Sequence, residues 1–149
     1  MSTSKDLREA TRILERNLED INSSDCCLCN VNTAQCHTLV EIGRKSDSML
    51  KDLAATLRID VSTASKIVEE LVKKDLVTRE PSKSDRRSIQ LNLSDKGKQI
   101  FHQIEKDMDY IFNEIIEFID PTERDTVLQS ITLYNQAIEK CKNEKQRNT

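Results

Sequence analysis

Glycine and proline are scarce in this chain of 149 residues, which contains only two of each. Both residues supply the turn geometry that an all-β fold needs at its many strand connections. Their scarcity, with 33% charged residues, excludes an all-β protein and favours a mainly helical one. The length fits one domain that buries a core without a disulfide or a metal. We therefore expect no cofactor to be required for folding.

Long hydrophobic runs are also absent. Charged residues regularly interrupt the apolar ones in the N-terminal segment MSTSKDLREATRILERNLEDI, so it forms neither a secretory signal nor a membrane span. We expect a cytoplasmic protein with no membrane partner. The sequence also lacks a glycine-rich phosphate loop, paired catalytic carboxylates and a nucleophile triad. No enzymatic activity is predicted.

The net charge of −3 shows no excess of basic residues, which argues against a protein that coats nucleic acid unspecifically. The distribution of charge is more informative. Residues 79–98 contain six basic and three acidic side chains, whereas residues 101–125 contain two basic and eight acidic ones. One part of the chain is therefore suited to face a polyanion while another faces water.

Apolar residues three and four positions apart predict helices at residues 5–21, 32–43, 49–57, 61–74, 95–119 and 120–142. We expect the polar residues 22–25 to end the first helix and Gly43 to end the second. Ser94 is the predicted N-cap of the fifth helix, and Asp120 that of the sixth. Residues 76–79 and 89–93 have the pattern of two strands joined by a charged connection.

The turn Arg58-Ile59-Asp60 joins two of these helices at the spacing of a helix-turn-helix. The second of the two has one apolar face and one polar face. Its predicted buried residues are Ala64, Ile67, Val68 and Leu71, and its outward residues include Ser62, Thr63, Ser65 and Lys66. A helix-turn-helix followed by a hairpin with a basic tip is the element order of a winged helix-turn-helix.

In this order the residues resemble the MarR family of bacterial transcriptional regulators over nearly the whole chain. The most specific likeness is DRRSIQLNLSDKG, residues 85–97, which is similar to the family's wing signature. Residues 53–77 are similar to its helix-turn-helix. Asp75 and Ser94 stand where the family usually has glycine and threonine, but aspartate tolerates a left-handed backbone and serine caps helices well.

The resemblance implies a mainly α fold with a small β-hairpin wing, in a single domain of residues 1–149. Residues of about 1–31 and 95–142 would form a homodimer through the terminal helices, and about 32–94 would form the DNA-binding lobe. Two recognition helices would then meet successive major grooves of a pseudo-palindromic operator in double-stranded DNA. The apolar stripes of the terminal helices agree with such a dimer.

Carried over by position, this resemblance also predicts the DNA-binding residues. Base edges or phosphates would be contacted by Ser62, Thr63, Ser65 and Lys66. Arg87 would enter the minor groove, whose negative potential attracts a guanidinium. Asp85 would orient Arg87, and Arg86 would contact a phosphate.

Four of the five cysteines lie in the segment SDCCLCNVNTAQCH, at positions 26, 27, 29 and 36. In a reducing cytosol, such a cluster is more often metal-binding or redox-active than a structural disulfide. Thiolates from Cys26, Cys27, Cys29 and Cys36 are enough for a tetrahedral Zn²⁺ site, and three of them suit trigonal As(III). Cys26 and Cys29 also have the spacing of a redox pair.

Packing in the core is the alternative for two of the cysteines. Cys36 precedes Leu39 and Val40 at helical spacing, so a core position and a ligand role both remain open for it. Cys141 ends an apolar stripe, where packing is favoured. A lone histidine on a helix usually makes an ordinary hydrogen bond, so His37 is not included in the candidate metal site.

We interpret the chain as a DNA-binding repressor whose operator affinity is controlled by a cysteine site that senses a soft metal or metalloid. As(III) is placed ahead of Zn(II) as the effector because three close thiolates suit it. The alternative is a MarR-like regulator in which Cys26 and Cys29 form a disulfide upon oxidation. A thiol oxidoreductase or metal carrier without DNA binding is a third hypothesis, but it leaves the wing and the recognition helix unexplained.

Overall fold

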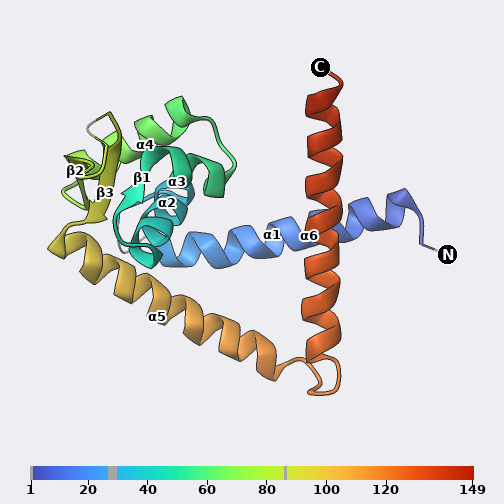
Figure 1. Ribbon diagram of the computed structural model, residues 1–149. Helices are drawn as coiled ribbons and strands as arrows, with labels where there is room; N and C mark the ends of the chain where they lie inside the picture. The colour runs from blue at the N-terminus through green and yellow to red at the C-terminus, as the bar shows by residue number, and fades with distance from the viewer. Residues whose placement is uncertain (1, 27–29, 86) are drawn as a thin grey trace. The chain divides into compact units, whose positions relative to one another are not determined.

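The computed structural model describes residues 2–26, 30–85 and 87–149, with residues 23–26 described by their backbone alone. Its helices are α1 (Ser4–Cys26), α2 (Thr33–Arg44), α3 (Leu50–Leu57), α4 (Val61–Lys73), α5 (Asp95–Glu117) and α6 (Arg124–Arg147) (Figure 1). The strands are β1 (Ser48–Met49), β2 (Val77–Pro81) and β3 (Ile89–Leu93). The mainly helical class with a small β wing is therefore confirmed. No helix in the described part of the chain is both long and apolar enough to cross a membrane.

The chain divides into two compact units, Met1–Met108 and Asp109–Thr149. The first unit contains the sheet, whose antiparallel strands are ordered β1-β3-β2. Strands β2 and β3 form the predicted hairpin, in which Val77 pairs with Leu93 and Pro81 pairs with Ile89. The short strand β1 pairs with the other edge of β3, and it was not predicted because two residues are too few to show a period.

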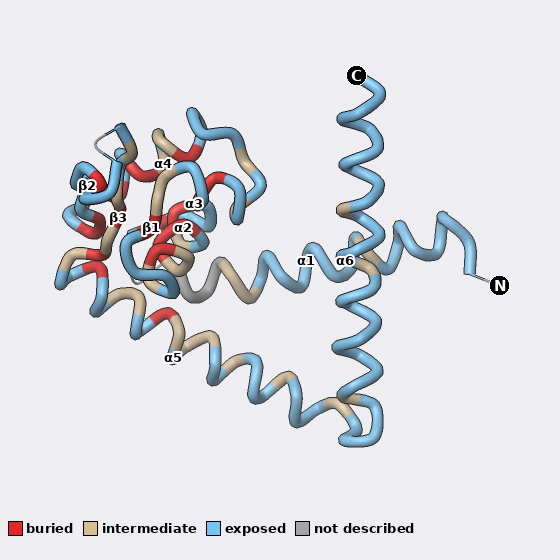
Figure 2. Tube along the Cα trace, in the orientation of Figure 1, coloured by how far each residue is buried: buried red, intermediate tan, exposed pale blue. Residues whose placement is uncertain are grey.

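The core of the first unit lies between the sheet and helices α2 to α4, where Figure 2 shows the buried residues gathered. Side chains of every one of these elements contribute to it. Its largest fully buried residues are Leu39, Leu71, Leu76, Leu91, Val68 and Thr38. The predicted apolar face of α4 is confirmed, since Ala64, Val68 and Leu71 are buried and Ile67 packs against the core. This packing leaves the opposite face of α4 outward.

Helix α4 ends in a left-handed turn formed by Asp75, which has a φ of 61°. The amide of Leu76 donates to the carbonyl of Leu71 at 2.9 Å, and the amide of Asp75 donates to that of Val72 at 3.0 Å. These two hydrogen bonds form a Schellman motif, which usually has glycine at the left-handed position. Asp75 therefore occupies the glycine position of the family pattern without loss of the turn.

Gly97 lets helix α5 approach the end of α4. A Cβ atom at this position would clash with the backbone carbonyl of Leu76. The hydroxyl of Ser94 accepts a hydrogen bond from the amide of Gly97 at 2.9 Å and donates one to the carbonyl of Asp75 at 2.6 Å. Ser94 is thus the N-cap of α5, as predicted, and it ties α5 to the turn after α4.

Two predicted helix ends in the first unit are wrong. Helix α1 does not stop at residues 22–25 but continues to Cys26. Polar side chains do not themselves break a helix, because a helix satisfies its own backbone hydrogen bonds. Helix α2 passes through Gly43 to Arg44. A Cβ atom on Gly43 would lie 2.5–2.7 Å from the ring of Phe101, so this glycine makes room for an aromatic side chain.

Both predicted ends of the last helix also need correction. The carboxylate of Asp120 accepts hydrogen bonds from the amide and hydroxyl of Thr122 at 2.9 and 2.7 Å. These bonds form a turn, and helix α6 begins only at Arg124. It continues to Arg147, beyond the predicted end at residue 142, because its polar C-terminal residues are good helix formers.

Candidate nucleic-acid interface

Helix α4 presents its first turns outward. Asp60 is the N-cap, and its carboxylate accepts a hydrogen bond from the amide of Thr63 at 2.8 Å. Of the predicted DNA-binding residues, Ser62, Thr63 and Lys66 are exposed and Ser65 is half-buried. The structure thus brings these residues together on one helix end whose short side chains allow close approach to a ligand.

The cap also predicts how stability depends on pH. The pKa of the Asp60 carboxyl is lowered from 3.8, mainly because the hydroxyl and the amide of Thr63 donate to it, with a smaller effect of the Lys66 charge. A lowered pKa means that the ionised cap stabilises the folded state above pH 3.8, and that this contribution is lost as the pH falls through the folded-state pKa.

We expect an Asp60→Ala variant to unfold at a lower urea concentration than the wild type at pH 7, because it lacks the cap. The difference should shrink as the pH is lowered below the ordinary carboxyl pKa of 3.8. An Asp60→Asn variant, which keeps an acceptor without the charge, is the matched control and should fall between the two. A difference that does not change with pH would show that the charge of Asp60 has no role.

The wing loop between β2 and β3 is shaped by Asp85. Its carboxylate accepts hydrogen bonds from the amide of Arg87 at 3.0 Å and from the hydroxyl of Ser88 at 3.2 Å. The amide of Ser82 closes the loop by donating to the carbonyl of Ser88 at 2.9 Å. Asp85 thus holds the backbone from which the exposed side chain of Arg87 projects. Arg86, the predicted phosphate contact, lies outside the described residues.

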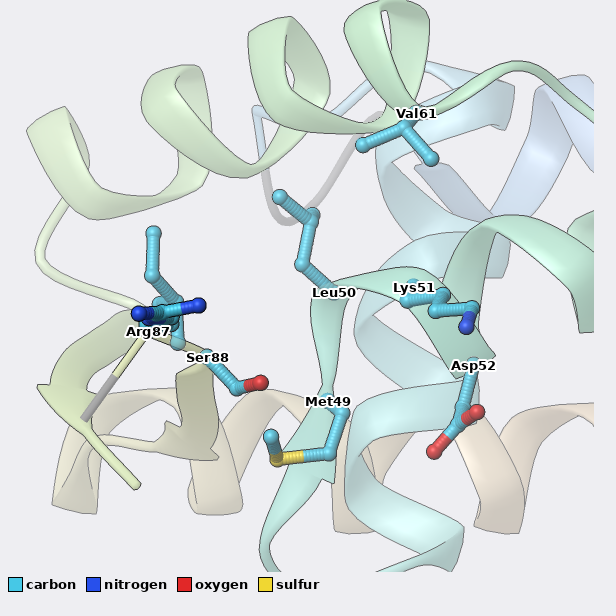
Figure 3. Close-up of a pocket in the computed structure, with 8 residues that line it drawn as sticks. Met49, Leu50, Lys51, Asp52, Val61, Arg87 and Ser88 are labelled. Carbon is cyan, nitrogen blue, oxygen red and sulfur yellow. The ribbon is translucent and has the colours of Figure 1, made fainter. Parts of the chain in front are cut away.

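An open groove of about 330 Å³ separates the start of α4 from the wing. Its lining residues are Met49, Leu50, Lys51, Asp52, Val61, Arg87, Ser88 and Ile89. Figure 3 shows Leu50 lying between Arg87 of the wing and Val61 of α4. Sequence reasoning missed Lys51 and Val61. Helical spacing places Val61 on the same side as the buried Ala64 and Val68, so no local pattern marked it as exposed.

The predicted cysteine site is only partly described. Cys26 is the last residue of α1, its side chain is not described, and Cys27 and Cys29 lie outside the described residues. Cys36 is half-buried in α2, where it packs against the core. Within the described ranges, no group of three His, Cys, Asp or Glu residues is arranged to hold a metal. His37 and Cys141 are both exposed, so the predicted packing of Cys141 does not occur within one chain.

Lys74 lies directly after α4, which we call the reading helix. Its side chain links the end of this helix to Asn30, the residue after Cys29. Its Nζ atom donates to the carbonyl of Asn30 at 2.6 Å and to Oε1 of Gln35 at 2.8 Å. Gln35 in turn belongs to the capping box that begins α2 with Asn32. Val31, between these residues, is buried in the core. The chain is therefore anchored to the DNA-binding lobe immediately after Cys29.

The first unit is a winged helix-turn-helix, the architecture of many DNA-binding regulators. It combines a reading helix with an outward polar end, a hairpin with an exposed arginine and a groove between the two. The comparisons agree. Residues 31–89 match the family model for the MarR family. The predicted resemblance to the MarR family is therefore confirmed for this lobe.

Known proteins extend the similarity beyond the lobe. The chain is 23% identical over 115 residues to the uncharacterised HTH-type transcriptional regulator YfiV of Bacillus subtilis, which covers 77% of this chain and 72% of YfiV. It is 32% identical over 82 residues to the regulator SarZ of Staphylococcus saprophyticus, or 55% of this chain and 56% of SarZ. These relatives are transcriptional regulators, in agreement with the prediction that the chain is not an enzyme.

The fold is also that of solved MarR-type structures. FabT of Streptococcus pneumoniae, solved in complex with DNA, superposes with a TM-score of 0.85 at 20% identity and covers 93% of this chain and 99% of FabT. A MarR protein from Peptoclostridium difficile superposes with a TM-score of 0.80 at 21% identity and covers 94% and 91%. The mainly helical winged fold therefore holds along nearly all of the chain.

Proposed function

We propose that the protein is a repressor that binds a pseudo-palindromic operator in double-stranded DNA as a homodimer. The observation that carries this proposal is the outward end of α4, with Ser62, Thr63 and Lys66, beside an exposed wing arginine. A helix end of this kind fits the major groove, and a wing arginine fits the narrower minor groove. FabT, of the same fold, was solved bound to DNA.

Exposed apolar residues support the homodimer. Large side chains of α1, of the end of α5 and of α6 are uncovered in the single chain. Examples are Leu128 and Leu133 of α6, which are 67% and 58% exposed, and Phe118, directly after α5, which is 93% exposed. Large apolar side chains that are exposed in such numbers on each of these helices are typical of interfaces. In a two-fold dimer, the two reading helices would meet half-sites about one helical turn apart.

The test is a retardation assay of the purified protein with DNA from upstream of its own gene, together with light scattering. We expect retention of one palindromic fragment and a mass twice the 17.1 kDa of one chain. The same fragment with one half-site scrambled is the control, and it should bind much more weakly. A monomeric mass, or equal binding to the scrambled fragment, would contradict the proposal.

We further propose that Cys26, Cys27 and Cys29 form an effector site for a soft metal or metalloid, with As(III) ahead of Zn(II). Three thiolates are the ligands that such ions prefer. The position supports regulation, because the next residue, Asn30, is bonded through Lys74 to the end of the reading helix. A ligand that shifts residues 26–29 would then change how α4 is held, and about 1–3 kcal/mol of coupling is enough for a switch.

We expect stoichiometric As(III) to change the operator affinity of the wild type about 5- to 150-fold, and not that of a Cys26→Ser/Cys27→Ser/Cys29→Ser variant. A Lys74→Met variant should still bind As(III) but respond less, because its link to Asn30 is lost. A Cys141→Ser variant, altered on α6, is the matched control and should respond like the wild type. An identical response of the triple variant would contradict the site.

The alternative is that a disulfide between Cys26 and Cys29 senses oxidants. The same DNA-binding assay distinguishes this disulfide from a metal or metalloid site. Loss of free thiols and a change of DNA affinity upon mild oxidation without metal would favour the disulfide. Protection of thiols by As(III) or Zn(II), with a change of affinity, would favour the metal or metalloid site. DNA binding in both cases excludes a simple thiol oxidoreductase or metal carrier.

A further inference from the structure

The groove between α4 and the wing is lined by both apolar and charged side chains. Met49, Leu50, Val61 and Ile89 supply the apolar lining. Val61 is 50% exposed and Ile89 is 40% exposed, although both are large hydrophobic residues. Lys51, at the start of α3, and Arg87, of the wing, contribute positive charge from two different elements, and Asp52 contributes the negative charge. An occupant with an anionic edge and an apolar middle would fit this lining.

The geometry of DNA supplies such an occupant if the proposed function holds. In B-DNA the major and minor grooves are separated by a single sugar-phosphate strand. A protein that places a helix in the major groove and a wing in the adjacent minor groove must let that strand pass between them. In this chain the space between the start of α4 and the wing is the groove lined by Lys51, Val61 and Arg87.

We propose that this groove seats one strand of the operator and that Lys51 contacts a phosphate of that strand. The exposed ammonium of Lys51 is the cation on the α3 side of the groove, opposite Arg87. It stands in the first turn of α3, where the helix dipole also favours an anion. The methyl groups of Leu50 and Val61 pack against deoxyribose carbons. Contacts of this kind position a protein on DNA without reading its sequence.

Asp52 also lines the groove but carries the opposite charge to Lys51. A carboxylate beside a phosphate weakens binding by like-charge repulsion. Neutralising Lys51 and neutralising Asp52 should therefore shift DNA affinity in opposite directions. Two adjacent substitutions on one exposed helix turn thus serve as each other's control.

The experiment measures the dissociation constant of the upstream duplex for Lys51→Gln, Asp52→Asn and Lys106→Gln variants between about 50 and 200 mM salt, the range over which phosphate contacts lose affinity. We expect Lys51→Gln to weaken binding roughly 5- to 10-fold and to reduce the salt slope by about one per subunit. Asp52→Asn should strengthen binding about twofold. Lys106→Gln, on α5 and outside the groove lining, should bind like the wild type. The Lys51→Gln substitution should lower the affinity for a duplex of random sequence by the same factor, since a phosphate carries no sequence information.

Duplexes in which single phosphates are replaced by neutral methylphosphonates identify the contact directly. At one position, this replacement should lower the DNA affinity of the wild type by the same factor as the Lys51→Gln substitution does. It should not lower the affinity of the Lys51→Gln variant any further. If the Lys51→Gln variant binds as tightly as the wild type with an unchanged salt slope, Lys51 does not contact a phosphate in the groove. The proposed function would remain intact. Failure of the wild type to bind any duplex would instead overturn the proposed function.

Discussion

Replacing Gly97 by alanine is expected to lower the free energy of unfolding by about 2–3 kcal/mol, although alanine is the better helix former by about 1 kcal/mol. The added Cβ atom would clash with the carbonyl oxygen of Leu76, which is backbone and cannot rotate away. Helix α5 would have to withdraw from the turn after α4. The hydrogen bonds of Ser94 to Gly97 and Asp75 would be strained or lost. Urea unfolding followed by circular dichroism measures the change.

The matched control is Gly43→Ala, at the other glycine of the chain. There the atoms nearest to the added Cβ belong to the ring of Phe101, a half-buried side chain rather than backbone. We expect a change within about 1 kcal/mol, because the helix preference for alanine offsets the displacement of the ring. Equal stability of the Gly97→Ala variant and the wild type would show that α5 does not need this close approach.

Replacing Arg87 by alanine is expected to weaken operator binding by roughly two orders of magnitude. Loss of one well-placed arginine contact costs about 1–3 kcal/mol, and the proposed homodimer has two wings. The salt slope should also decrease by about one per subunit. Folding should be unaffected, because Arg87 is exposed and the hydrogen bond to Asp85 uses its backbone amide. Retardation of the upstream duplex at several salt concentrations measures the effect.

An Arg87→Lys variant distinguishes charge from shape. Lysine keeps the positive charge but lacks the planar guanidinium, so we expect the salt slope to be retained and the affinity to fall part of the way. Arg79→Ala, on strand β2 and outside the groove lining, is a control for loss of charge elsewhere on the hairpin. Binding by Arg87→Ala as tight as that of the wild type would exclude the wing from the interface.

The sequence predicted the helix-turn-helix well because each of its features is local. The turn at residues 58–60 and the buried face of Ala64, Val68 and Leu71 follow from residue type and helical spacing. The alternation in residues 89–93 likewise predicted strand β3 to the residue. The wing loop was located by its charge. Asp85 was predicted to orient Arg87, and its carboxylate accepts a hydrogen bond from the Arg87 backbone amide.

Features that depend on distant contacts were missed. Gly43 was predicted to end a helix, because the sequence does not show that Phe101 lies against it. Lys51 was missed because only the tertiary fold brings the start of α3 to the wing. The link from Lys74 to Asn30 spans 44 positions of sequence, and no local pattern predicts a hydrogen bond over that distance.

Spacing and capping in the sequence thus determined the element order and the outward face of the reading helix, since both depend on neighbouring residues. The tertiary structure alone decided where glycine is indispensable, which cation shares a groove with Arg87 and which residue joins the cysteine segment to α4. The physical reason is that steric exclusion and hydrogen bonds act between atoms close in space, and only folding brings Gly97 to Leu76 and Lys74 to Asn30.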